Sequence, residues 1–92
     1  MDIFGPDELR VIEAVSALLI LNPPSPNETS ETYAERMAKW SILQGPNVRW
    51  EAMWHVIYSM HQAYLQGSQQ KDVLYQIGAR ALQDYDNGTQ LE

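Results

Sequence analysis

Three short clusters of proline and glycine divide this chain of 92 residues into four segments. The clusters are Asn22–Pro26, Gly45–Asn47 and Gly67–Ser68. Proline removes a backbone donor and disfavours helix in the residue before it, and glycine tolerates the left-handed backbone that ends helices. The segments between the clusters are roughly 15 to 20 residues long, which is typical of helices and too long for single strands. Because no segment alternates strictly between apolar and polar residues, the sequence predicts an all-α fold.

We therefore expect four mostly antiparallel helices, joined by short loops of proline and glycine, in one domain over residues 1–92. The expected helices cover residues of about 6–21, 26–44, 47–66 and 69–86, with a frayed tail over 87–92. The residues expected to cap the second, third and fourth helices are Ser25, Asn47 and Ser68. Because the residues after Glu28 are polar and form helix poorly, the regular part of the second helix can also begin nearer Ser30. Crossing angles larger than those of a regular bundle are the alternative packing.

The fourth expected helix contains a glycine near its centre. Gly78 lies among the apolar residues that supply the buried face of this helix, which are Val73, Leu74, Ile77, Ala81, Leu82 and Tyr85. Glycine inside a helix costs about 1 kcal/mol relative to alanine. Close packing of another helix against Gly78 would account for the glycine.

The composition excludes several classes of site and partner. The chain has no cysteine, so it has no disulfide, no cysteine-ligated zinc and no thiol nucleophile. A net charge of −6 argues against nucleic acid, whose binding needs lysine and arginine against the phosphates. Prolines interrupt the uncharged stretch between Ala14 and Glu28, so no segment is expected to span a membrane. Residues 1–3 lack the positively charged start of a secretory signal, and we expect a cytoplasmic location.

Charge is distributed unevenly along the chain. Residues 1–35 have a balance of −6, residues 36–80 a balance of +3, and residues 81–92 a balance of −3, which sum to −6. Opposite blocks of this kind can steer two copies together or guide a charged partner. The simpler interpretation is that acids and bases intermix once the chain has folded.

The third expected helix has an unusually wide apolar surface. At about 100° per residue, its polar side chains fall within about 80° of one another. These side chains are Glu51, His55, Ser59, Gln62 and Gln66. Apart from His61, the remaining residues are apolar and fill an arc of roughly 220°, about twice the stripe that a surface helix of a monomer needs. Either this is the central helix and the other three cover it, or its edge of Trp54, Tyr58 and Leu65 contacts a partner.

Aromatic side chains are the main candidates for a binding surface. The chain has three Trp, five Tyr and four Met, which are residue types enriched in protein interfaces. The edge of Trp40 on the second helix is an alternative location for the contact. The residues predicted to bind a partner are Trp40, Trp50, Trp54, Tyr58, His61 and Leu65.

The sequence offers little support for catalysis or metal binding. Glu51 and His55 are four residues apart on one helical face, so they could supply half of a metal site or an acid–base pair. No third ligand has a suitable spacing, and a solvent-exposed pair is the simpler interpretation. His61 lies about 120° from that face and is interpreted as a satisfied core or interface histidine, with a pH-sensing or catalytic role as the alternative. We therefore expect no catalytic residue, no cofactor and no metal.

These observations favour a small acidic, non-catalytic protein that binds another protein through an aromatic-rich helical surface. Its role would be that of an inhibitor, an adaptor or an assembly chaperone. One alternative is a structural homo-oligomer, in which the same surface pairs with that of a second copy. Another is a small helical enzyme with its site near Glu51 and His55. Nucleic acid and membranes are not expected as partners.

Overall fold

The computed structural model describes the backbone of residues 5–90 and the side chains of residues 7–88, and this part of the chain contains four helices and no strand. The helices are α1 (Gly5–Leu21), α2 (Ser30–Ser41), α3 (Trp50–Leu65) and α4 (Lys71–Gln90). The predicted all-α fold of four helices is confirmed. Within the same residues, no helix combines the length and the apolarity that a crossing of a bilayer requires.

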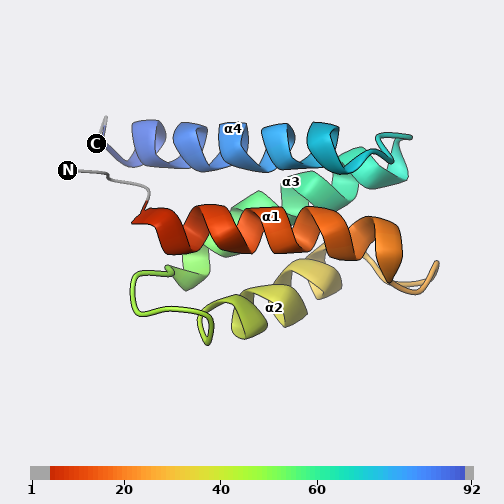
Figure 1. Cartoon of the computed structure of the whole chain (residues 1–92), viewed down its shortest axis with the longest axis horizontal. Coiled ribbons are helices and arrows are strands. Elements are labelled where there is room, and N and C mark those ends of the chain that lie inside the picture. The colour runs from red at the N-terminus through yellow and green to blue at the C-terminus, as the bar shows by residue number, and fades with distance from the viewer. Residues whose placement is uncertain (1–4, 91–92) are drawn as a thin grey trace.

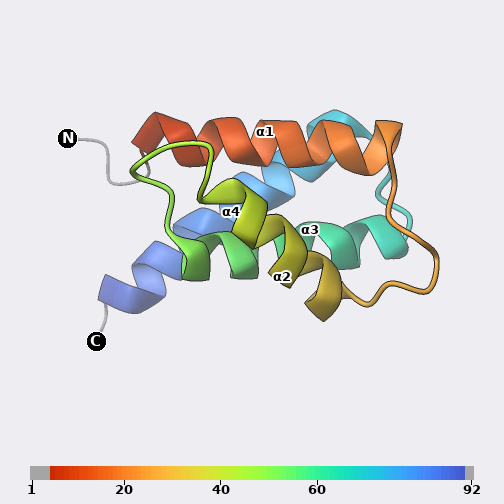
Figure 2. The same ribbon diagram turned by 90° about the horizontal axis from the view of Figure 1, so that it is seen from below.

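Helix α3 is the central helix, because α1, α2 and α4 all pack against it. In Figure 1, α1 lies in front of α3, and α4 and α2 lie on either side of this pair. Helix α2 is antiparallel to α3, since Ser30 at its start contacts His61 near the end of α3. Figure 2 shows α2 and α4 inclined to α1 rather than parallel to it, so the packing is less regular than that of an ideal bundle.

The start of α2 differs from the expected start at residue 26. The helix begins at Ser30, and its cap is Thr29, whose Oγ1 accepts a hydrogen bond from the backbone N–H of Thr32 at 3.1 Å. Ser25, the expected cap, instead accepts a hydrogen bond from the backbone N–H of Asn27 at 3.3 Å within the preceding turn. The prediction of Ser25 as the cap is therefore wrong, and the alternative start near Ser30 is correct. The helix also ends at Ser41, before the expected residue 44.

The expected caps of α3 and α4 are also wrong. Arg49 rather than Asn47 occupies the cap position of α3, and its side chain makes no capping hydrogen bond. Ser68 belongs to the end of α3, because its N–H donates to the carbonyl of Ala63 at 3.0 Å while Gly67 adopts a φ of 111°. This pattern is the glycine-terminated helix end of the Schellman type, which satisfies the last carbonyls of the helix.

The end of α4 extends beyond the expected residue 86. The helix continues through Asn87 and Gly88 to Gln90, so residues 87–90 are not the frayed tail that the sequence predicts. The last two residues of that predicted tail, 91–92, lie outside the described residues. A glycine costs only about 1 kcal/mol in a helix, and Asp86 is anchored to Arg49 at 2.6 Å just before it.

The buried core draws side chains from all four helices and from the loop before α3. Its apolar members are Val11, Ile12, Val15, Leu19, Tyr33, Ala34, Met37, Ala38, Val48, Ala52, Met53, Val56, Ile57, Met60, Leu74 and Leu82. Gly78 is buried between Ile12 and Met60, and a Cβ atom there would lie 2.6 Å from Cγ2 of Ile12 and 2.7 Å from Sδ of Met60. The glycine therefore permits the close approach of α4 to α1 and α3.

One arginine joins three helices at the end of the molecule where α3 begins. Arg49 donates to both carboxylate oxygens of Glu8 on α1 at 2.9 and 3.0 Å, and to both oxygens of Asp86 on α4 at 2.6 and 3.2 Å. The backbone N–H of Arg49 also donates to Glu8 at 3.0 Å. Glu8 is 1% exposed and Asp86 is 5% exposed. These hydrogen bonds raise the pKa of Arg49 above its ordinary value, and they leave both buried carboxylates partnered.

Candidate functional site

The residues predicted to bind a partner do not form a single surface. Trp50, Trp54, Tyr58 and Leu65 follow one edge of α3, where Trp50 and Leu65 are exposed and the two residues between them are partly buried. Trp40 lies on the flank of α2 that faces α1. His61 is only 1% exposed, so it lies in the core and does not contribute to an exposed surface.

Four rings form a continuous strip on the outer face of α3, the face turned away from α1. We call Tyr58, Trp54, His55 and Tyr85 the aromatic strip. Tyr58 stacks on Trp54 with 5.3 Å between ring centroids, Trp54 contacts the edge of His55 at 5.3 Å, and His55 lies 5.4 Å from Tyr85 of α4. The strip thus crosses from the edge of α3 beside α2 to α4. Sequence reasoning missed His55 and Tyr85 as members, because only the packing of α3 on α4 brings these two rings together.

The end of the strip on α4 is held by polar contacts. The hydroxyl of Tyr85 donates to Oε1 of Glu51 at 2.7 Å, and this hydrogen bond is the main cause that raises the pKa of Tyr85. The guanidinium carbon of Arg49 lies 5.9 Å from the centre of the Tyr85 ring. The position of Tyr85 is therefore linked to the ion pairs that join α1, α3 and α4.

A shallow groove of about 400 Å³ lies between α3 and α4 on the same side of the molecule. It is lined by Ser59 of α3 and by residues of α4, which are Val73, Gln76, Ile77, Arg80, Ala81 and Asp84. Val73, Ile77, Ala81 and Tyr85 recur every four residues and so form one stripe along α4 that ends in the aromatic strip. We call the aromatic strip and this groove together the outer surface.

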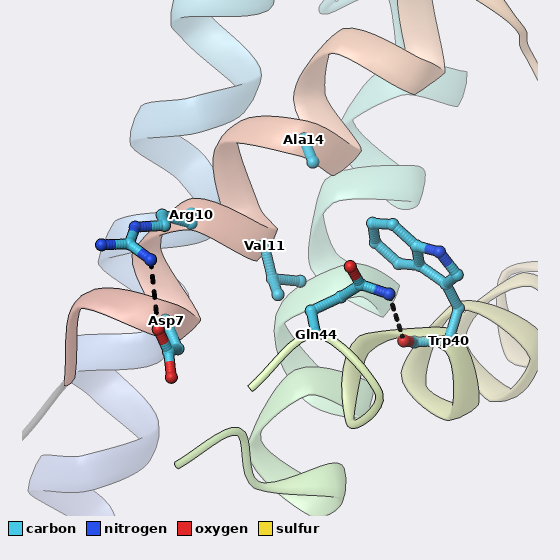
Figure 3. A pocket seen from close by; sticks show the side chains of 6 residues that line it. All are labelled: Asp7, Arg10, Val11, Ala14, Trp40 and Gln44. Atoms are coloured by element: carbon cyan, nitrogen blue, oxygen red, sulfur yellow. Dashed lines mark hydrogen bonds and ion pairs between the residues drawn. The ribbon is translucent and has the colours of Figure 1, made fainter. Parts of the chain in front are cut away.

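Trp40 lines a separate groove of about 260 Å³ between α1 and α2. Figure 3 shows its indole on one wall, with Val11 and Ala14 of α1 facing it and the ion pair of Arg10 with Asp7 at one end. The lining is apolar apart from this pair and Gln44, whose amide donates to the carbonyl of Trp40 at 3.1 Å. The groove can accept an apolar side chain, but it holds no cluster of titratable groups for chemistry.

His61 takes part in a buried polar network. Its Nδ1 lies 2.6 Å from Oγ of Ser30, and the amide of Gln62 donates to the same Oγ at 2.8 Å. The ring of Tyr33 stacks on the imidazole at 4.9 Å, and burial raises the pKa of Tyr33 to about 12. A serine beside a histidine can form an activated nucleophile, but Ser30 is only 4% exposed and a substrate cannot reach its hydroxyl. The interpretation of His61 as a satisfied core histidine is therefore the one that its surroundings support.

Acid is expected to destabilise the fold through His61. Burial lowers the pKa of its imidazole below the ordinary value of 6.5, so the unfolded chain gains the proton at a higher pH than the folded chain. The free energy of unfolding therefore rises with pH between the lowered pKa of the folded chain and the ordinary value of 6.5. This contribution to stability is lost as the pH falls through the same interval. Melting temperatures between about pH 5 and pH 7 should follow this trend, and His61→Gln should remove this part of it. An unchanged pH dependence in the variant would assign the effect to another group.

Glu51 and His55 are both exposed, and both contact rings of the aromatic strip rather than forming an isolated pair. Glu51 accepts the hydrogen bond from Tyr85, and the His55 ring lies between Trp54 and Tyr85. Among the side chains that the structure describes, no group of three or more histidine, aspartate and glutamate residues has the arrangement of a metal site.

Comparison with known proteins finds no family model that matches the chain, no curated protein that is similar to it and no solved structure that resembles it. The surfaces of the molecule are therefore the only guide to its function.

Proposed function

We propose that this chain is a cytoplasmic, non-catalytic domain that binds another protein through its outer surface. The observation that carries the proposal is the aromatic strip: four rings in mutual contact at 5.3 to 5.4 Å lie outside the fully buried core. Tryptophan and tyrosine are the residue types that most often dominate the energy of protein interfaces.

The strip is also ordered before any partner arrives. Trp54 and Tyr58 lie with their rings nearly parallel, at 14°, and Tyr85 is held by Glu51. Side chains that already occupy one conformation lose little entropy on binding, so more of the contact energy contributes to affinity. The adjacent groove along α4 adds apolar area of the kind that accepts a helix of a partner.

Trp54→Ala and Tyr58→Ala are expected to abolish capture of the partner while the domain remains folded. Loss of a central aromatic residue from an interface costs about 2 to 4 kcal/mol, or roughly 30- to 1,000-fold in affinity. The immobilised domain should capture the partner from the extract of its native cell, and the affinity of the identified protein should then be measured by calorimetry. Far-UV circular dichroism should show native helix content in both variants.

The matched control is Leu21→Ser, because Leu21 at the end of α1 is an apolar side chain that is 81% exposed and lies outside the outer surface. This variant should bind the captured protein as the unchanged domain does. If both aromatic variants unfold, their side chains support the core and the proposal fails. It also fails if both variants bind the partner normally.

A symmetric homodimer through the same edge of α3 is the second candidate. Trp50 at the start and Leu65 at the end of this edge are both exposed, at 38% and 57%. An antiparallel pairing of two α3 helices would bring each Trp50 against the Leu65 of the other copy, as a two-fold interface requires. Sedimentation equilibrium over a wide range of concentration tests this candidate, and a constant monomer mass would exclude it.

A further inference from the structure

The cations of this chain are almost all neutralised within the fold. Five of the six lie within 4.0 Å of a carboxylate, namely Arg10, Arg36, Arg49, Lys71 and Arg80. The bases of residues 36–80 mostly pair with acids of the other two blocks, as Arg49 does with Glu8 and Asp86. The uneven blocks of charge in the sequence therefore intermix in the folded chain, and they do not produce two oppositely charged faces.

Most of the charge that is not neutralised within the fold is negative. Among the described side chains, the carboxylates without a cation within 4.0 Å are those of Glu31, Glu35, Glu51 and Asp72. Among the described side chains, Lys39 is the one lysine or arginine without a carboxylate within 4.0 Å. Glu51 contacts Tyr85 and so borders the aromatic strip directly.

Glu31 and Glu35 are exposed carboxylates of α2, the helix beside which the other end of the strip begins. On the circumference of α2 they lie about 180° and 140° from Trp40, which faces α1. They are thus on the flank of α2 turned away from α1. On α3, Trp54 lies about 20° from His61, which contacts α2, so the strip begins beside α2.

The chain itself already binds two guanidinium groups with a carboxylate and an aromatic ring. Arg36 donates to both oxygens of Glu28 at 2.7 and 3.1 Å while its guanidinium lies 5.3 Å from the centre of the Tyr33 ring. Arg49 combines its carboxylates with the ring of Tyr85 in the same way. Within the described residues, no such guanidinium lies against the rings of Trp54 and Tyr58 at the other end of the aromatic strip.

We infer that the partner presents arginine or lysine side chains to the outer surface, an inference that rests on the proposed function and adds the chemistry of the partner. A guanidinium group stacks on Trp54 or Tyr58 and forms ion pairs with the carboxylates at the rim. A second copy of this chain is the less suitable occupant, because each copy has a net charge of −6 and opposes the other.

Selection from a random peptide library tests the inference without knowledge of the partner. The library is selected on the unchanged domain, and peptides that still bind Trp54→Ala are discarded. The remaining peptides should be enriched in arginine and lysine and depleted of aspartate and glutamate. Neutral or acidic peptides that depend on Trp54 would overturn the inference and leave the proposed function intact. If no peptide depends on Trp54, both fail.

A binding titration then tests whether the positive charge of the peptide, rather than its shape, determines the affinity. One selected peptide is compared with the same peptide in which citrulline, the neutral analogue, replaces every arginine. The dissociation constant of the complex should be about two- to twenty-fold higher for the citrulline peptide. A similar rise is expected for the original peptide with the domain variant Glu31→Gln/Glu35→Gln, or when salt is added. The control is Asp72→Asn, which removes a carboxylate beside α1 and Glu13, away from the strip, and should change nothing. Equal binding of the citrulline peptide would overturn the inference.

Discussion

Arg49→Met is expected to lower the free energy of unfolding by about 3 kcal/mol. The substitution removes the cation that both buried carboxylates, Glu8 and Asp86, bind at 2.6 to 3.2 Å. Loss of one partner from a buried ion pair costs about 3 to 5 kcal/mol, and the lower end applies here because the Arg49 side chain is 43% exposed. Methionine retains the apolar stem, so the loss reports mainly on charge. Urea unfolding measures it, and the melting temperature should fall by roughly 12 to 24 °C.

Two comparisons identify the cause of this loss. Arg36→Met removes a guanidinium bound to Glu28 at the surface, where its side chain is 55% exposed, and should cost less than about 1 kcal/mol. The triple variant Arg49→Met/Glu8→Gln/Asp86→Asn removes the two charges that Arg49 neutralised and should recover part of the lost stability. If Arg49→Met costs no more than the surface variant, the three-helix cluster does not stabilise the fold.

Gly78→Leu is expected to destabilise the domain by about 2 kcal/mol. A Cβ atom alone would lie within 2.7 Å of Ile12 and Met60, so a larger side chain must push α4 away from α1 and α3. Overpacking of a core typically costs about 1 to 3 kcal/mol, and the gain in helix propensity offsets less than about 1 kcal/mol. Urea unfolding of the variant measures the net effect.

The matched control for this prediction is Gly88→Leu. Gly88 lies in the same helix with no atom within 4 Å of an added Cβ, so its substitution should stabilise the domain by up to about 1 kcal/mol. Gly78→Leu/Met60→Ala should recover part of the loss, since it vacates volume beside the new side chain. If Gly78→Leu does not fold, Gly78→Ala should lower the free energy of unfolding by a smaller amount, because its Cβ atom meets the same two side chains. Equal stability of Gly78→Leu and Gly88→Leu would contradict the close packing.

The number and approximate positions of the helices could be predicted from the sequence, because the features that separate helices act locally. A proline or a glycine affects the backbone within about one turn, whatever the rest of the chain does. The exact ends could not be predicted in the same way. Asn47 and Ser68 are good capping residues, but Arg49 is held by Glu8 from 41 residues away, and Ser68 closes the end of the preceding helix.

The candidate site was predictable only in part. The surplus of apolar residues on the third helix indicated an edge with Trp54 and Tyr58, and both side chains lie at the rim of the core. The same pattern included His61, which the packing of α2 buries, and it omitted Tyr85, which reaches the strip only because α4 packs beside α3. Helical periodicity assigns a residue to a face, but it does not say which neighbour covers that face.

By itself, the sequence determined the helical class, the breaks between helices and an excess of aromatic surface, since these depend on residue types and on spacings within a few turns. Tertiary structure alone decided which rings touch, which carboxylates keep their charge unneutralised, and why residue 78 has no side chain. Each of these outcomes depends on pairs such as Arg49 with Asp86, 37 residues apart, whose distance only the packed helices determine.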